Sequence, residues 1–269
     1  MAGSLTVHMV VRDEDQWVWF ALQSVLPYAD QILVTDTGSR DHTIQCIQAI
    51  SSPKIVFSSV TANSPAAVTA VRQRQINLTK TDWFWLVDGD EIYPTKTARE
   101  VVRATQKNYE GIAVRRYDLL GDVYHRQKES IGEYHLYGVR GHLVSRLINK
   151  RKIPGVYVEG IYPREGYFDC EGVSLQDHAP KNWYITDSHL FHAMYLRRSS
   201  SGSNLAYVFN RKKYKIEIGV AVEGELPEIF SLPRPAFVPD PTLVRSKVYE
   251  LTAHVTAPLK SFRRRLRSL

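Results

Sequence analysis

The sequence predicts an α/β fold in which a mostly parallel sheet carries helices on both faces. Short apolar runs alternate with helical patterns along the first hundred residues, and acidic loops follow three of those runs. The 269 residues are enough for one large domain with a sizeable core. Because parallel strands end at the same edge of a sheet, the acidic loops should meet where such folds bind ligands.

The first half of this fold is expected to contain four strands and three helices. The strands cover residues 5–11, 31–35, 54–58 and 83–87. Helices are predicted over residues 15–26, from a cap at Ser39 or Asp41 to about residue 50, and over residues 65–78.

The remaining elements are a helix, three strands and a C-terminal extension. The helix covers residues 95–106 and the strands cover residues 111–117, 142–149 and 155–160. Residues 118–141 have no clear period, and residues 226–241 are proline-rich. A last helix is expected from about residue 241 to the end.

Charge is distributed unevenly along a chain of net charge +7. Residues 1–100 carry 8 Lys and Arg against 11 Asp and Glu, whereas residues 191–269 carry 14 against 6. The basic C-terminal part favours an anionic partner, namely phosphate, nucleic acid or a membrane surface. The alternative is that these residues form a solvated basic face without a partner.

Cys46 and Cys170 are isolated, which excludes a zinc ribbon or a disulfide scaffold. We expect a soluble cytoplasmic protein, since the sequence has no long apolar segment and no export signal.

The sequence Asp88-Gly89-Asp90-Glu91 directly follows the most apolar strand. Carboxylates at the mouth of a buried strand need a cation, a ligand or water, so a divalent metal is one expectation. A plain turn is the alternative. The chain has no G-x-G-x-x-G after its first strand and no P-loop.

Two motifs, residues 33–43 and residues 85–91, give the chain a resemblance to the family 2 glycosyltransferases with the GT-A fold. The resemblance covers about residues 4–200. It implies a catalytic domain over residues 1–200, with a nucleotide-sugar-binding half (1–110) and an acceptor-binding half (111–200), followed by the basic extension 201–269.

The resemblance also implies roles for individual residues. Asp36 would contact the nucleotide base, Asp88 would lie near the ribose, and Asp90 would bind Mn²⁺ or Mg²⁺ together with His192, with His189 as the competing histidine. The other donor-binding residues would be Val10, Arg12, Glu14, Arg72, Gly89 and Arg197. Arg74 is an alternative to Arg72.

Inverting sugar transfer also needs a base for the acceptor hydroxyl. Glu159, at the end of a short apolar strand, is the candidate; the alternative is that it only pairs with Lys152 or Arg164. The next choices are Asp118, Asp122 and Glu133.

The sequence therefore predicts a metal-dependent hexosyltransferase that moves a sugar from a nucleotide diphosphate sugar, with UDP-sugar as the expected donor, to a glycan or lipid-linked glycan. The alternatives are a sugar-phosphate nucleotidyltransferase, which would need a glycine-rich loop after the first strand, and a non-catalytic basic binding module. No motif for reading nucleic acid is present.

The C-terminal helix has apolar residues every three or four positions and an arginine-rich end. It is expected either to contact the inner face of a membrane or to pack its apolar side on the catalytic domain.

Overall fold

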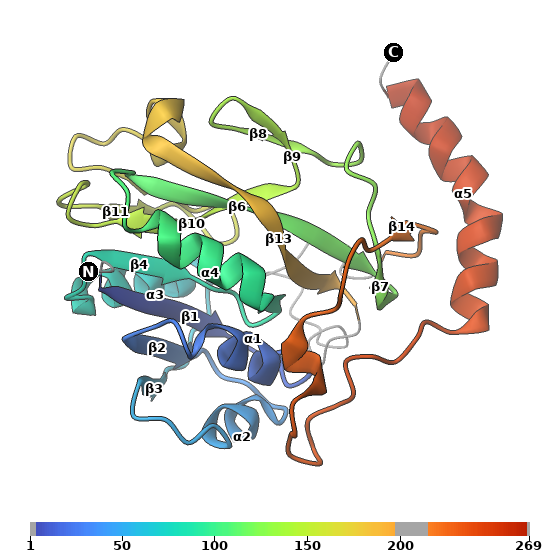
Figure 1. Cartoon of the computed structure of the whole chain (residues 1–269), viewed down its shortest axis with the longest axis horizontal. Helices are drawn as coiled ribbons and strands as arrows, with labels where there is room; N and C mark the ends of the chain where they lie inside the picture. The colour runs from blue at the N-terminus through green and yellow to red at the C-terminus, as the bar shows by residue number, and fades with distance from the viewer. Residues whose placement is uncertain (1–3, 197–214, 268–269) are drawn as a thin grey trace.

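The structure, a computed structural model, describes residues 4–196 and 215–267. Within these ranges a ten-stranded sheet has the order β14-β7-β6-β10-β4-β1-β2-β3, and β13 pairs with both β6 and β5 (Figure 1). Its strands are β1 (Leu5–Val11), β2 (Gln31–Asp36), β3 (Ile55–Ser59), β4 (Trp83–Leu86), β5 (Glu91–Ile92), β6 (Gly111–Leu120), β7 (Asp122–Arg126), β10 (Leu143–Asn149), β13 (Trp183–Tyr195) and β14 (Val220–Ala221). The α-helices are α1 (Val18–Val25), α2 (Thr43–Gln48), α3 (Pro65–Leu78), α4 (Thr95–Ala104) and α5 (Lys247–Arg267).

The first four strands form the parallel part of the sheet, as predicted. Strand β1 lies between β2 and β4, and β2 also pairs with β3, all in parallel. Successive side chains of β4 point to opposite faces, so Trp85 packs in one core cluster and Phe84 in the other. Helices α1 and α4 contribute to the first cluster, and Ile76 of α3 contributes to the second. The prediction of helices on both faces is therefore confirmed.

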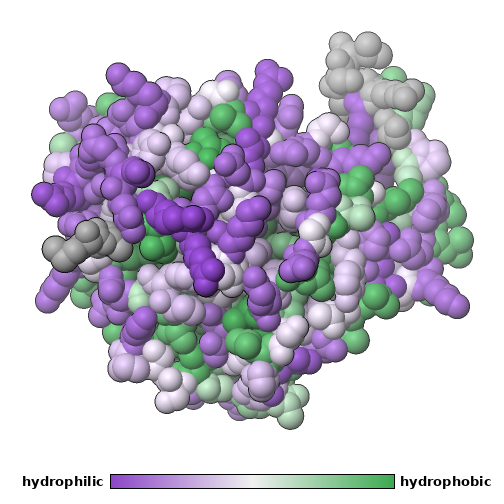
Figure 2. Space-filling view, viewed as in Figure 1, coloured by the Kyte–Doolittle hydropathy of each residue, from purple (hydrophilic) through white to green (hydrophobic). Residues whose placement is uncertain are grey.

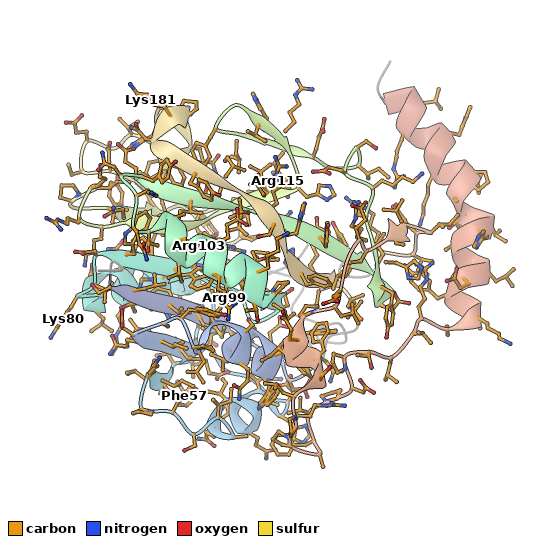
Figure 3. All side chains as sticks on the ribbon, viewed as in Figure 1. Phe57, Lys80, Arg99, Arg103, Arg115 and Lys181 are labelled. Atoms are coloured by element: carbon orange, nitrogen blue, oxygen red, sulfur yellow. The ribbon has the colours of Figure 1, made fainter. Side chains whose placement is uncertain are left out.

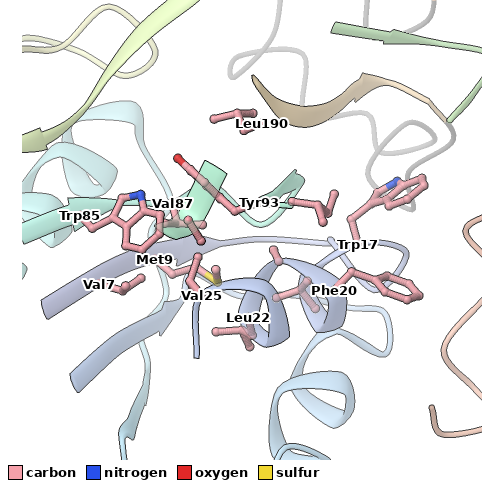
Figure 4. Packing of buried hydrophobic residues seen from close by; sticks show 14 of the residues in the cluster. Val7, Met9, Trp17, Phe20, Leu22, Val25, Trp85, Val87, Tyr93 and Leu190 are labelled. Carbon is pink, nitrogen blue, oxygen red and sulfur yellow. The ribbon is translucent and has the colours of Figure 1, made fainter. Parts of the chain in front are cut away.

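The core under α1 is built from large apolar side chains. Figure 4 shows Val7 and Met9 of β1 and Trp85 of β4 lying near Leu22 and Val25 of α1. All five side chains are fully buried. Helix α4 covers the same face, burying Ala98 and Val101 and pointing Arg99 and Arg103 outward (Figure 3).

The second half of the sheet is mixed. Strand β10 runs antiparallel to both β4 and β6, and β13 runs parallel to β6. Near its end β13 also pairs with the two-residue strand β5, so that His192 lies opposite Asp118 on one side and Glu91 on the other. This pairing brings residues from distant parts of the sequence to one place.

The stretch 118–141, which shows no sequence period, is largely extended. Strand β6 continues to Leu120 and turns into β7, and a small sheet forms from β8 (Tyr134–Leu136) and β9 (Val139–Gly141). Pairing with β13 stabilises β6 and pairing with β14 stabilises β7, and such tertiary pairing leaves no periodicity in a local sequence window. A second small sheet pairs β11 (Tyr157–Glu159) with β12 (Gly166–Phe168).

The C-terminal helix begins later than expected, at Lys247, and stands at one side of the molecule (Figure 1). Its large aliphatic residues face away from the rest of the chain, contrary to the alternative that they pack on it: Val248, Leu251, Val255 and Leu259 are each at least 66% exposed. None of the helices in the described ranges is both long and apolar enough to span a bilayer.

The buried His8 gives the fold a testable dependence on pH. Its Nε2–H donates to Thr79 Oγ1 (2.5 Å), because the Thr79 hydroxyl donates to the Gln75 carbonyl, and His8 Nδ1 is buried without a hydrogen-bond partner in the described part of the chain. Burial, helped by the charges of Arg72 and Lys150, lowers the pKa of His8 to about 3. Below about pH 6.5 the unfolded chain therefore binds a proton at His8 and the folded protein does not, so the free energy of unfolding falls as the pH is lowered.

We expect His8→Phe to remove this dependence and to keep the ring stacked on Phe84. Between about pH 7.5 and pH 5, the wild-type protein should lose about 2 kcal/mol of unfolding free energy relative to the variant. Urea unfolding of both proteins across this range measures the difference. Parallel pH curves would contradict the prediction.

Candidate active site

A cavity of about 1400 Å³ opens at the carboxyl ends of β1 and β4, the edge at which the sequence predicts a site. Its walls also include β10, β13, the loop between β11 and β12, and α5. Eight residues proposed from the sequence line it: Val10, Arg12, Glu14, Arg72, Asp88, Gly89, Asp90 and His192.

Gly89 allows the turn after β4 to lie against β1. A Cβ atom at this position would lie 2.9 Å from Val11 Cγ1 and 3.3 Å from Glu14 Cγ. Real Cβ atoms do not approach another carbon as closely as the first distance, so any other residue would displace the turn that carries Asp88 and Asp90.

Asp88 lies between two buried arginines. Its Oδ1 is 3.2 Å from Arg72 Nη2, and its Oδ2 is 2.6 Å from Arg146 Nη2. Each arginine also binds a second carboxylate: Arg72 Nε lies 3.0 Å from Glu165 Oε1, and Arg146 Nε donates to Glu91 Oε1 over 3.0 Å. Burial alone would raise the pKa of Asp88, but the charges of Arg146 and Arg72 hold it well below its usual range. Asp88 is therefore a fixed negative charge.

Asp90, two residues further on, has a different environment. Burial raises its pKa to about 6, the negative charges of Asp88 and Glu91 add to the effect, and His192 opposes it. His192 Nε2 lies 3.5 Å from Asp90 Oδ2, and its Nδ1 lies 3.0 Å from Asp118 Oδ1. Burial lowers the pKa of His192, but the nearby carboxylates of Asp90 and Asp118 raise it overall.

This arrangement fits a divalent cation. Asp118 accepts the Nδ1–H of His192, so Nε2 faces the Asp90 carboxylate, and the neutral ring can offer its Nε2 lone pair to a cation at that place. Such a carboxylate–histidine pair fixes the tautomer of a metal-binding imidazole. Residues 4–196 and 215–267 contain no group of three His, Cys, Asp or Glu residues placed to hold an ion, so further oxygen ligands would have to come from a bound molecule or water.

The sequence profile of the family described as "Glycosyl transferase family 2" matches residues 6–157, more than half of the chain. The chain belongs to glycosyltransferase family 2. Its fold is accordingly the GT-A arrangement expected from the sequence, and the family match does not support the alternative assignments as a nucleotidyltransferase or a non-catalytic binding module. A search of curated protein sequences gave no match.

Several solved structures are similar to this member of glycosyltransferase family 2. TarS 1-349 from S. aureus has a TM-score of 0.46 and 10% identity, covering 71% of this chain and 60% of that one. Mannosyl-3-phosphoglycerate synthase from Rubrobacter xylanophilus has a TM-score of 0.47 and 14% identity, covering 71% and 66%. The mannosyltransferase PcManGT from Pyrobaculum calidifontis, solved with GDP-Man and Mn2+, has a TM-score of 0.43 and 14% identity, covering 72% and 58%. This chain thus spans less than two thirds of the length of TarS 1-349.

Asp36 lies at the end of β2, next to the cavity wall and not in it. Its carboxylate accepts hydrogen bonds from the backbone of Gly38 (2.9 Å) and Ser39 (3.1 Å), whereas Thr37 lines the cavity. The carboxylate therefore shapes the loop after β2, and its contact with a nucleotide base stays a prediction.

Glu159 is not in the cavity that Asp88 and Asp90 line. It is exposed at the end of β11, pairs with Gly166 across the small sheet, and does not line the cavity. The loop that follows turns back, so that Glu165 lines the cavity instead. The second choices do not line it either: Asp118 and Asp122 are buried against histidines, and Glu133 lies near Arg140.

The structure favours one residue in each pair of alternatives from the sequence. Arg72 is buried against Asp88, whereas Arg74 is exposed. His192 lines the cavity, whereas His189 stacks on Tyr117 with ring centroids 4.2 Å apart. Arg197 lies outside the described residues.

Charged residues of the site that were not anticipated include Arg146 and Glu165, whereas Glu91 was expected only as one of the carboxylates of the turn after β4. Arg146 had a sequence signal, because it is a charged residue within an apolar strand, which needs a buried partner. The position of Glu165 depends on the loop between β11 and β12, for which the sequence gives no comparable signal.

Removing Arg146 should destabilise the protein strongly. Arg146→Met leaves the Glu91 carboxylate, whose side chain is 0% exposed, without its buried cation. Breaking a buried pair in this way costs about 3–5 kcal/mol of unfolding free energy. Guanidinium unfolding measures the loss, and Arg74→Met, at an exposed position, is the control and should change stability by less than about 0.5 kcal/mol. Equal effects of the two substitutions would contradict the network.

Proposed function

We propose that this glycosyltransferase moves a hexose, with inversion, from a nucleotide diphosphate sugar to a hydroxyl of a glycan or lipid-linked glycan. A UDP-sugar is the expected donor. The observation that carries the proposal is the meeting of Asp88, Asp90 and His192 in one cavity at the carboxyl ends of β1 and β4. A cavity of this size, lined by charged side chains of both signs, has room for a nucleotide sugar.

The donor would occupy the side of the cavity formed by residues 1–110. Val10, Arg12, Glu14 and Gly89 line this side, and the fixed charge of Asp88 would accept hydrogen bonds from ribose hydroxyls. Residues 111–200 would then hold the acceptor. Arg72 and Arg146 position Asp88 for this contact through their ion pairs.

Asp90 and His192 would hold Mn²⁺ or Mg²⁺. When bound, such an ion would offset the negative charge that develops on the departing diphosphate. The role of the chain is to keep the two ligands oriented: Asp118 fixes the ring of His192, and the backbone of β13 lies beside Asp90, whose carbonyl accepts from the Ala193 N–H over 2.9 Å.

The acceptor hydroxyl would attack the anomeric carbon on the face opposite the diphosphate while a carboxylate takes its proton. Glu159 is the base proposed from sequence. Glu165 is the alternative that the structure offers, because it lines the cavity and its Oε2 is buried without a hydrogen-bond partner among the described residues.

Thermal stabilisation by nucleotide sugars tests the function. A panel of UDP- and GDP-sugars, each with and without Mn²⁺, should include a donor that raises Tm by about 5–10 °C at saturating concentration, because ligand binding stabilises the folded state by mass action. Asp90→Asn should abolish the Mn²⁺-dependent part of the shift. Asp187→Asn, which changes an exposed carboxylate, is the matched control and should retain it. If no nucleotide stabilises the wild-type protein, the proposal is wrong.

Two matched substitutions identify the base. Glu159→Gln and Glu165→Gln both remove a carboxylate and keep the shape of the side chain. Loss of the base should lower kcat by about 10²-fold or more, with donor affinity unchanged. We expect this result for one of the two variants and near-normal kcat for the other, measured by release of the nucleotide diphosphate. Normal turnover in both variants would place the base elsewhere.

A further inference from the structure

The outer side of α5 presents a continuous apolar surface. Val248, Leu251, Val255, Leu259 and Phe262 are spaced by three or four residues, so they share one face of the helix. They are between 64% and 74% exposed. Figure 2 shows apolar side chains on the side of the molecule where Figure 1 places α5. We call these five residues the outer stripe.

The opposite side of α5 holds the helix on the catalytic domain. Tyr249 and Ala253 are 5% and 0% exposed, and Tyr249 Oη donates to the carbonyl of Lys215 over 3.0 Å. On the same side, Lys260 and Arg264 reach the wall of the donor cavity. The helix is therefore attached through its more polar side, the reverse of a helix that buries its apolar face in its own domain.

Charge decides between the possible partners of the outer stripe. Residues 242–269 contain seven Lys and Arg and one acidic residue, Glu250. Two copies of the chain joined stripe to stripe would bring these like charges together. Arg245 pairs with Glu250 and Arg264 with Glu217, but the basic residues of this segment still outnumber the acidic one seven to one. An anionic lipid surface would instead attract this net positive charge and bury the apolar residues, which is the pattern of a helix that lies in a bilayer interface.

We infer that α5 docks the protein on an anionic membrane surface through the outer stripe, with its other side forming a wall of the active-site cavity. This inference rests on the proposed function for one consequence: the acceptor is then a lipid-linked glycan held in that membrane. The docking itself does not depend on the identity of the donor.

Cosedimentation of the full chain with lipid vesicles tests the docking surface. The vesicles are pure phosphatidylcholine, or phosphatidylcholine with about one third phosphatidylglycerol. The wild-type protein should bind the anionic vesicles, bind the neutral ones much more weakly, and dissociate at high salt.

The stripe variant combines Leu251→Glu, Val255→Glu and Leu259→Glu. The matched control combines Leu78→Glu, Val173→Glu and Leu232→Glu, which alters exposed apolar residues elsewhere by the same total charge. We expect the stripe variant to lose at least tenfold in vesicle binding and the control to lose less than threefold. A version with Ser at the three stripe positions tests the same face if the Glu version does not fold.

The inference is wrong if the stripe variant binds vesicles as well as the control does, or if the wild-type protein binds neither kind of vesicle. It is also wrong if light scattering shows that the wild-type protein and the control are dimers and the stripe variant is a monomer. The rise in Tm on adding the donor, measured on each variant, distinguishes failure of the docking inference from failure of the proposed function. The inference is supported if the stripe variant keeps the rise in Tm and loses vesicle binding. It is also supported if no nucleotide stabilises any of the proteins and the stripe variant still loses vesicle binding.

Discussion

The site depends on a buried ion-pair network in which two arginines hold three carboxylates. Arg146 binds Asp88 and Glu91, and Arg72 binds Asp88 and Glu165. Desolvating this many charges is costly, so the network exists only because each carboxylate has a cation within hydrogen-bonding distance. The network joins α3, the turn after β4, β10 and the loop between β11 and β12, and it thereby sets the shape of the cavity floor.

The same network gives two neighbouring carboxylates different properties. Asp88 has two arginines and stays ionised, whereas burial raises the pKa of Asp90 to about 6, although His192 and Arg146 partly offset its charge. Burial disfavours the charged form of such a carboxylate, and a bound cation would favour it. One turn of four residues thus holds a carboxylate that stays ionised and the carboxylate proposed above as a metal ligand.

Local pattern was enough to predict the parallel half of the sheet and the acidic turn at Asp88, because each depends on a strand that is evident in the sequence. The donor-side residues, Arg72 among them, were assigned through the family resemblance, and most of them line one cavity. The predictions that failed or stayed open depend on contacts between distant segments. The end of β6 and β7 are strands because β13 and β14 pair with them, and Glu165 reaches the cavity because the loop after β11 turns back, neither of which a sequence window records. The outward direction of the apolar face of α5 is of the same kind, since amphipathicity reveals a stripe and not what it faces.

The pairing of β13 with β5 has a consequence for motion. His192 is one residue from Ala193, whose N–H donates to the Asp90 carbonyl, and Phe191 and His192 lie in register with Ile92 and Glu91. The main chains on which Asp90 and His192 stand are therefore parts of one hydrogen-bonded sheet and must shift together. The loop between β11 and β12 and helix α5 line the same cavity and are not part of this sheet. A surface to which α5 is attached would therefore act on one wall of the cavity.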